Sequence, residues 1–284
     1  MKRMYIMALL VVVLGGAALS QEVSLRDRFY GRVGIGGGIG LCYYDPCDYY
    51  YDEDYYYPDY DNLRSVGFAL GDGFNVSLAG GYMFNKHLGV ELGVKDFFGL
   101  NKKTTYTSNQ TTGTVSDVVK THGMIFQVIP AFVLRAGFEK FDPYARFGLI
   151  IGAVPRVYMT ETEMFYGSES PDLNTENYTG VYKGGVAVGF TAAVGVNFKI
   201  TDHISLFSEF DCNGINYSPK KYILTKDELN GVDQLPNLSM SEKETDFVKK
   251  YDALQTSTDE PAKHLKISMP FSNVELNVGM TYKF

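Results

Sequence analysis

The stretch GVAVGFTAAVGVNFKI, residues 185–200, decides the fold. Large apolar side chains such as Val188, Phe190 and Val194 occupy its even positions, apart from one Ala. The odd positions hold only Gly, Ala, Thr, Asn and Lys. Successive side chains of a β-strand point to opposite faces, so this run predicts one strand with an apolar face and a small or polar face.

The same two-residue alternation recurs along the chain. It is clear in residues 75–84, 88–95 and 273–284, and weaker in residues 29–41, 124–134, 143–153 and 204–213. Together with the first stretch, these segments make eight predicted strands. After the first twenty residues, no segment has the roughly 20 consecutive apolar residues that a membrane-spanning helix needs.

The polar face of these strands is rich in small residues. They are Gly34, Gly36, Gly93, Gly148, Gly152, Gly185, Gly189, Gly195 and Gly279. A solvated surface does not limit side-chain size, whereas the interior of an eight-stranded barrel is only just wide enough for its side chains. We therefore predict that the polar face points inward and the apolar face meets lipid. The opposite register would put Lys95 into hydrocarbon, which costs a free energy of about 2–4 kcal/mol for a Lys near the bilayer midplane.

Short and long connections alternate between the predicted strands. The short ones are residues 85–87, 137–139 and 201–203, and the long ones are residues 42–73, 99–122, 155–183 and 214–270. This plan predicts an all-β fold, an eight-stranded antiparallel transmembrane β-barrel with meander topology. Its short turns lie in the periplasm, its long loops are extracellular, and outer-membrane lipid surrounds its wall.

The first twenty residues have the composition of a signal peptide. Lys2 and Arg3 precede an apolar run, and Ala18-Leu-Ser20 supplies the small residues that a signal peptidase recognises. We therefore expect cleavage of residues 1–20, which leaves one barrel domain, residues 21–284. Without Lys2 and Arg3, 24 of the 26 basic residues remain against 33 acidic ones, a net charge of −9 that argues against nucleic acid as a partner.

The C-terminal stretch VELNVGMTYKF, residues 274–284, resembles the closing strand of Gram-negative outer-membrane barrels, which ends in an aromatic residue. Residues 81–91 and 195–205 look like strand-turn-strand units of the OmpA membrane domain, OmpX and opacity-type barrels. The resemblance implies a location in the bacterial outer membrane and an assembly machinery that recognises Phe284 and Tyr282. It is specific for architecture rather than activity, because such barrels include structural proteins, adhesins, narrow pores and a few enzymes.

Alternation directs eight charged residues into the lumen. They are Arg32, Glu91, Lys95, Arg146, Glu209, Asp211, Glu275 and Lys283. Buried charges must be paired, so we expect a salt-bridged interior that plugs the barrel. The resulting hypothesis is a non-enzymatic protein with a structural or surface-interaction role through its extracellular loops. The alternative is a small passive pore, and catalytic carboxylates are a more distant one.

Enzyme and metal motifs are weak in this sequence. His203-Ile-Ser205 resembles the His-x-Ser of outer-membrane lipid A deacylases, a lipid-modifying alternative, but it falls at a predicted periplasmic turn. The glycines from Gly34 to Gly40 lack the spacing of a phosphate-binding loop. The four His residues do not share metal-ligand spacing with a second His or Cys. We therefore predict no catalytic residue, no metal centre and no cofactor.

The first long connection combines acidic residues with Tyr and has no basic residue between Cys42 and Asp61. A solvated acidic loop is the simplest interpretation, with at most weak Ca²⁺ binding. Tyr side chains also offer large contact area at low entropic cost, so an extracellular partner is the functional alternative. The candidate contact residues are Tyr49, Tyr50, Tyr51, Tyr55, Tyr56 and Tyr57. Cys42 and Cys47 can close a small disulfide in an exported protein, which leaves Cys212 unpaired and facing lipid.

The fourth long connection contains a helix signal. Ser241 and Glu244 have the spacing of a capping box, and Phe247, Tyr251 and Leu254 follow at helical spacing. We expect this apolar stripe to pack on the rim of the barrel.

Overall fold

The computed structural model describes residues 28–41, 70–110, 113–166, 173–250 and 257–284. Within these residues, no helix is long and apolar enough to cross a membrane. The predicted signal peptide, residues 1–20, and most of the first long connection lie outside the described residues.

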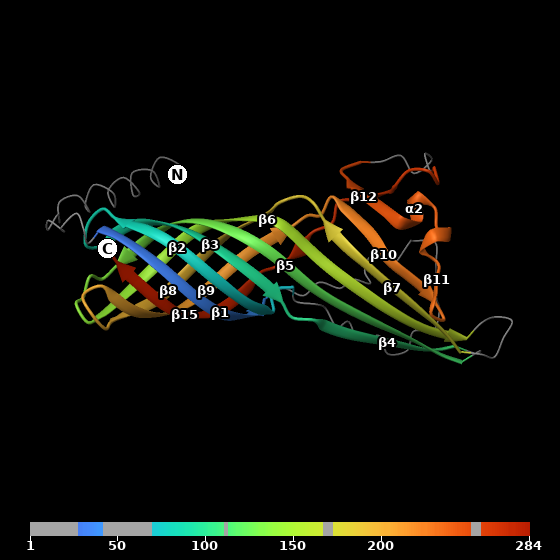
Figure 1. Cartoon of the computed structure of the whole chain (residues 1–284), viewed down its shortest axis with the longest axis horizontal. Helices are drawn as coiled ribbons and strands as arrows, with labels where there is room; N and C mark the ends of the chain where they lie inside the picture. The colour runs from blue at the N-terminus through green and yellow to red at the C-terminus, as the bar shows by residue number, and fades with distance from the viewer. Residues whose placement is uncertain (1–27, 42–69, 111–112, 167–172, 251–256) are drawn as a thin grey trace, which may run out of the picture.

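Strand pairing closes eight antiparallel strands into a barrel, whose wall is seen from the side in Figure 1. Each strand pairs with the next around the ring, and the last strand pairs back with the first. In ring order they are β1 (Phe29–Gly40), β2 (Gly73–Met83), β3 (Leu88–Gly99), β5 (Gly113–Arg135), β6 (Phe141–Tyr166), β8 (Ala187–Lys199), β9 (Ile204–Tyr217) and β15 (Asn273–Lys283). The predicted eight-stranded barrel is confirmed, because each predicted strand corresponds to one of these.

Alternation orients the barrel strands as predicted. In β8, the side chains of Val188 and Phe190 are 60% and 66% exposed on the outer wall, whereas Thr191 and Ala193 are buried inside. In β15, Leu276 faces outward while its neighbours are buried. Large apolar side chains exposed all around the wall suit hydrocarbon as the surrounding solvent.

Three short turns join β2 to β3, β5 to β6 and β8 to β9 at one end of the barrel, here called the turn end (Figure 1). In the first turn, Asn85 Oδ1 accepts hydrogen bonds from the backbone N–H groups of His87 and Leu88, both at 2.8 Å. In the second turn, Gly137 has a φ of 76°, and Asp142 Oδ1 accepts its N–H at 2.6 Å. Asn and Asp side chains commonly hold tight turns in this way.

Aromatic side chains gather at the turn end. The rings of Phe29 and Tyr82 are 4.9 Å apart, and those of Tyr282 and Phe284 are 5.2 Å apart. Rings at this level are typical of the girdle that outer-membrane barrels place at a membrane–water interface.

At the opposite end, several strands continue beyond the barrel (Figure 1). β4 (Lys102–Gln110) pairs with the first half of β5, β7 (Leu173–Lys183) with the second half of β6, and β10 (Lys221–Leu229) with β7. We call these paired segments the extended sheet. The expectation of long loops over residues 99–122, 155–183 and 214–229 is therefore wrong for most of these residues. Both faces of these strands carry polar residues, so hydropathy alternation could not reveal them.

A β-bulge marks the point where β6 leaves the barrel. The register pairs Met124 with Arg156 and Phe126 with Ala153, which leaves two residues of β6, Val154 and Pro155, opposite one residue of β5. Val154 has a φ of 49°, a region that β-branched residues rarely adopt. A bulge of this kind bends the strand and shifts its side-chain alternation by one residue.

The remainder of the fourth long connection forms short elements. They are β11 (Val232–Asp233), η3 (Leu235–Asn237), α2 (Met240–Lys243), β12 (Glu244–Val248), β13 (Ala262–Leu265) and β14 (Met269–Pro270). A capping box is present, but it joins Ser239 and Glu242 rather than the predicted Ser241 and Glu244. The predicted pair has the same spacing two residues later, but Ser241 lies inside α2 and Glu244 is the extended residue that ends it.

The helix predicted to contain Phe247 is also wrong. α2 ends after about one turn, and Phe247 lies in β12, buried against the ring of Tyr182 at a centroid distance of 6.0 Å. The two later positions of the predicted stripe, Tyr251 and Leu254, lie outside the described residues.

Candidate functional site

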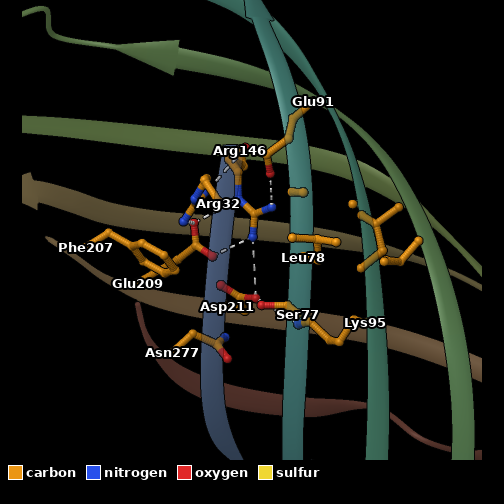
Figure 2. Close-up of a pocket in the computed structure, with 14 residues that line it drawn as sticks. Arg32, Ser77, Leu78, Glu91, Lys95, Arg146, Phe207, Glu209, Asp211 and Asn277 are labelled. Carbon is orange, nitrogen blue, oxygen red and sulfur yellow. Dashed lines mark hydrogen bonds and ion pairs between the residues drawn. The ribbon is translucent and has the colours of Figure 1, made fainter. Parts of the chain in front are cut away.

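Seven charged side chains from five barrel strands meet inside the lumen, and Figure 2 shows six of them. We call this set the lumen charge cluster. It consists of Arg32 on β1, Glu91 and Lys95 on β3, Arg146 on β6, Glu209 and Asp211 on β9, and Glu275 on β15. All seven are between 1% and 8% exposed.

Arg146 is the most connected member of the lumen charge cluster. Its Nη1 lies 2.7 Å from Glu91 Oε1, and its Nε and Nη2 lie 2.8 Å and 2.5 Å from the two carboxylate oxygens of Glu209. Its Nη2 also lies 3.7 Å from Asp211 Oδ2. The guanidinium of Arg32 shares both glutamates, 3.4 Å from Glu91 and 3.3 Å from Glu209. A guanidinium group suits such bidentate contacts because its N–H donors are held in a rigid, planar arrangement.

Lys95 forms the second half of the lumen charge cluster. Its Nζ lies 3.1 Å from Asp211 Oδ2 and 2.6 Å from Glu275 Oε2. Asp211 therefore joins the Lys95 half to the Arg146 half. The cluster has three bases and four carboxylates, so its fully ionised form carries a net charge of −1.

Aromatic side chains complete the environment of Arg32. The ring centroid of Phe207 lies 4.1 Å from its guanidinium carbon, and the hydroxyl of Tyr144 accepts a hydrogen bond from its Nη2 at 2.7 Å. The Phe207 ring lies so close to the wall that a Cβ at Gly34 or Gly279 would be 2.8 Å or 2.6 Å from it. The small residues on the inner face therefore make room for side chains that cross the lumen.

Amide side chains line the lumen beside Glu275. Asn273 Nδ2 donates to Glu275 Oε1 at 2.9 Å, and Asn75 Nδ2 donates to Asn277 Oδ1 at 3.0 Å. A cavity of about 30 Å³ remains among Lys95, Asn277 and their neighbours, with room for about two water molecules. A second cavity, toward the turn end, has a volume of only about 10 Å³.

An apolar layer fills the lumen on the side toward the extended sheet. Its members are Leu70, Phe97, Ile125, Ile129, Ile150, Val157, Ala187, Ile215, Tyr217, Phe247, Ile267, Met269 and Phe271. Met269 and Phe271 are 0% and 1% exposed and come from the segment just before β15. The ring of Phe271 lies where a side chain at Gly123 would be, since a Cβ there would be 2.5 Å from it. Sequence reasoning missed this layer because it assigned residues 214–270 to an external loop.

The structure brings together seven of the eight predicted lumen charges. The eighth, Lys283, is half-buried at the turn end of β15, opposite Tyr30. The predicted assembly residues Tyr282 and Phe284 face outward at the same end, and Cys212 is exposed on the outer wall. The candidate loop contacts, Tyr49 to Tyr57, and the predicted disulfide of Cys42 and Cys47 lie outside the described residues.

The family model described as outer membrane protein beta-barrel domain matches residues 7–234. The chain belongs to this family. No curated protein matches the sequence. Among solved structures, the barrel is similar to the attachment invasion locus protein Ail of Yersinia pestis, at 9% identity and a TM-score of 0.31, over 90% of this chain and 97% of that one. It is also similar to CarO2 of Acinetobacter baumannii, at 11% identity and a TM-score of 0.31, over 89% and 98% of the two chains.

Family membership places this outer-membrane barrel in the bacterial outer membrane, as predicted. Outer-membrane barrels keep their short turns in the periplasm and their long connections outside the cell. The turn end therefore faces the periplasm, and the extended sheet projects from the cell surface.

Proposed function

We propose that this outer-membrane barrel is a non-enzymatic protein whose plugged lumen supports an extracellular interaction surface. One observation carries the proposal: two successive layers, the lumen charge cluster and the apolar layer, fill the lumen between the turn end and the extended sheet. The cavity left within the cluster, about 30 Å³, is too small for a continuous column of water.

The ion-pair geometry supports a fixed plug rather than a selective pore lining. An ion can pass a ring of charges only if its binding there is favourable yet weak enough for release. In the lumen charge cluster each base is already held by at least two carboxylates at 3.4 Å or less. Opening a path would break several buried ion pairs at once, and breaking even one costs about 3–5 kcal/mol.

The extended sheet supports the surface role. It is built from long strands that continue out of the barrel wall, so it is held in place by the same hydrogen-bonded ladder as the barrel. A binding surface on such a rigid scaffold loses little conformational entropy when a partner binds.

Conductance of the refolded protein in planar lipid bilayers tests the plug. We expect no steady current above the bilayer background, with a known porin added to the same membrane as a positive control. A steady, ohmic current from the wild-type protein would refute the plugged lumen and favour the small passive pore.

A further inference from the structure

Five carboxylates lie together on one face of the extended sheet. The strand register pairs Asp117 of β5 with Glu163 of β6, and Glu163 with Glu176 of β7. In the neighbouring row, Glu161 of β6 is paired with Tyr178 of β7, which is paired with Asp227 of β10. Directly paired side chains share a face, with Cβ atoms about 4.5–5.5 Å apart. We call the five acidic residues, Asp117, Glu161, Glu163, Glu176 and Asp227, the acidic patch.

No base neutralises the acidic patch within the described residues. The nearest bases on these strands, such as Lys120 and Lys226, are paired with residues of the opposite face. None of the ion pairs between described residues includes a member of the patch. Like charges directly opposite each other destabilise a sheet, so the bare arrangement is unfavourable.

An independent observation points to a missing ligand. Asp227 is only 4% exposed, and its Oδ1 is buried without a hydrogen-bond partner among the described residues. Its register position opposite Tyr178 directs it onto the face of the patch. A buried carboxylate oxygen without a partner loses its hydration and gains nothing in return, so such atoms are rare in folded proteins.

This environment raises the pKa of four of the five acids. Burial, together with the nearby carboxyl of Asp117, raises the pKa of Glu161 to about 8. Burial also raises the pKa values of Asp117, Glu163 and Asp227. A cation placed among these groups would favour their ionised forms, so binding should release protons at neutral pH.

The geometry favours an extended cation over a point charge. Within the described residues, no group of three His, Cys, Asp or Glu side chains is arranged to hold a metal ion. The carboxylates instead follow rows that cross neighbouring strands, which are about 4.8 Å apart. Ammonium groups separated by short methylene chains can match such a spacing, and the Tyr178 ring offers a further contact for a cation.

We infer that the acidic patch binds a linear organic polycation, an aliphatic polyamine, whose ammonium groups lie along the two carboxylate rows. The inference rests on the proposed role of the extended sheet as an interaction surface, and it names the chemistry of the ligand. Hydrogen bonds from ammonium would satisfy Asp227 Oδ1 and replace the mutual repulsion of the paired acids with attraction.

Calorimetric titration of the full chain in detergent micelles with spermine tests the inference. The test variant is Glu163→Gln with Glu176→Gln, and Glu228→Gln is the control because Glu228 lies on the opposite face, paired with Asn177. We expect saturable binding by the wild type, about tenfold weaker binding by the double variant and unchanged binding by the control. Asp227→Asn should also weaken spermine binding. Gel electrophoresis of unheated samples, in which a folded barrel migrates differently from the unfolded chain, verifies that every variant is folded.

Proton release provides a second measurement. At neutral pH, the apparent binding enthalpy of the wild type should change with the ionisation enthalpy of the buffer, and Glu161→Gln should reduce this change. The titratable groups that face Glu161 are Asp117, Glu163, Glu176, Tyr178 and Asp227.

Three outcomes would overturn the inference. The first is an equal loss of spermine affinity in the double variant and in the Glu228→Gln control. The second is that Ca²⁺ displaces spermine and binds more tightly than spermine does, and the third is that a lysine-rich peptide binds whereas spermine does not.

The plug is tested separately. A steady bilayer current with intact spermine binding would refute only the plugged lumen, whereas a silent bilayer without spermine binding would refute only the polyamine site.

Discussion

Replacing Arg146 with Met probes the lumen charge cluster most directly. Arg146 contacts three of the four carboxylates, Glu91, Glu209 and Asp211, and is 8% exposed. Removing its charge changes the net charge of the ionised cluster from −1 to −2, because four carboxylates would then face only two bases.

We expect Arg146→Met to reduce the free energy of unfolding by about 3–5 kcal/mol, the usual cost of leaving a buried charge without its partner. Glu209→Gln should cost less, because it makes the net charge zero and leaves both arginines in contact with Glu91. The double variant should cost less than the sum of the two single variants, with a coupling energy of about 0.5–3 kcal/mol. Lys102→Met is the control, because the Lys102 side chain in its ion pair with Asp72 is 41% exposed, and ion pairs open to solvent are worth about 0–1 kcal/mol.

The chain contains no Trp, so the assay follows folding by gel migration. After equilibration in a urea series, the folded and unfolded forms are separated by gel electrophoresis of unheated samples. The unfolding curve and the refolding curve are compared to verify that equilibrium was reached. Our reasoning would be refuted if Arg146→Met were no more destabilising than Lys102→Met, or if its effect and that of Glu209→Gln were additive.

Four other outcomes are expected. Val278→Arg places a charge on the lipid-facing side near the middle of β15, so it should make the free energy of folding into the membrane less favourable by about 2–4 kcal/mol. Val278→Leu should insert normally in the same folding assay. Deleting Phe284 should lower the folded fraction recovered in the outer membrane without changing synthesis, and an unchanged yield would contradict its role in assembly. Because the folded pKa of Glu161, about 8, exceeds its ordinary value of 4.5, its contribution to stability is present below pH 4.5 and is lost as the pH rises toward 8. The hydrogen-exchange protection factors of the extended sheet, which are corrected for the intrinsic rate at each pH, should therefore fall across that range, and Glu161→Gln should flatten the trend. Deleting Val154 should preserve spermine binding, because it leaves the pairing of Glu161 and Glu163 with β5 unchanged, and Val154→Gly should preserve it too in the same calorimetric titration.

The barrel was predictable because lipid imposes a strong rule on every spanning strand. A side chain such as Phe190 must face hydrocarbon, and a side chain such as Lys95 must not, so the period of two fixes the inner and outer faces. The same rule predicted which charges point inward. It could not predict the partners, because the contact between Arg146 and Glu209 depends on how two strands separated by β8 are staggered around the ring.

The extended sheet was not predictable by that rule because it lies outside the membrane. In β7, one face carries Glu176 and Tyr178 and the other carries Asn177 and Thr179, so neither face is apolar. Strand pairing there depends on partners far along the chain, such as Asp227 for Tyr178. Sequence reasoning therefore assigned these segments to loops and missed the acidic patch.

The bulge at Val154 shifts the side-chain alternation of β6 before the acidic patch begins. Within the barrel, the even-numbered residues of β6, such as Arg146 and Ile150, face the lumen. Beyond the extra residue, the inner face passes to odd-numbered residues, so Glu161 and Glu163 share a face with Asp117 of β5, which has no extra residue. Deleting Val154 removes only this extra residue and keeps the pairing beyond it, so Glu161 and Glu163 stay on the same face as Asp117. Glycine at this position keeps the extra residue and relieves the positive φ, so comparing Val154→Gly with the deletion separates backbone strain from the bend of the bulge. If the deletion variant folds and no longer binds spermine, the carboxylate rows alone are not the binding site.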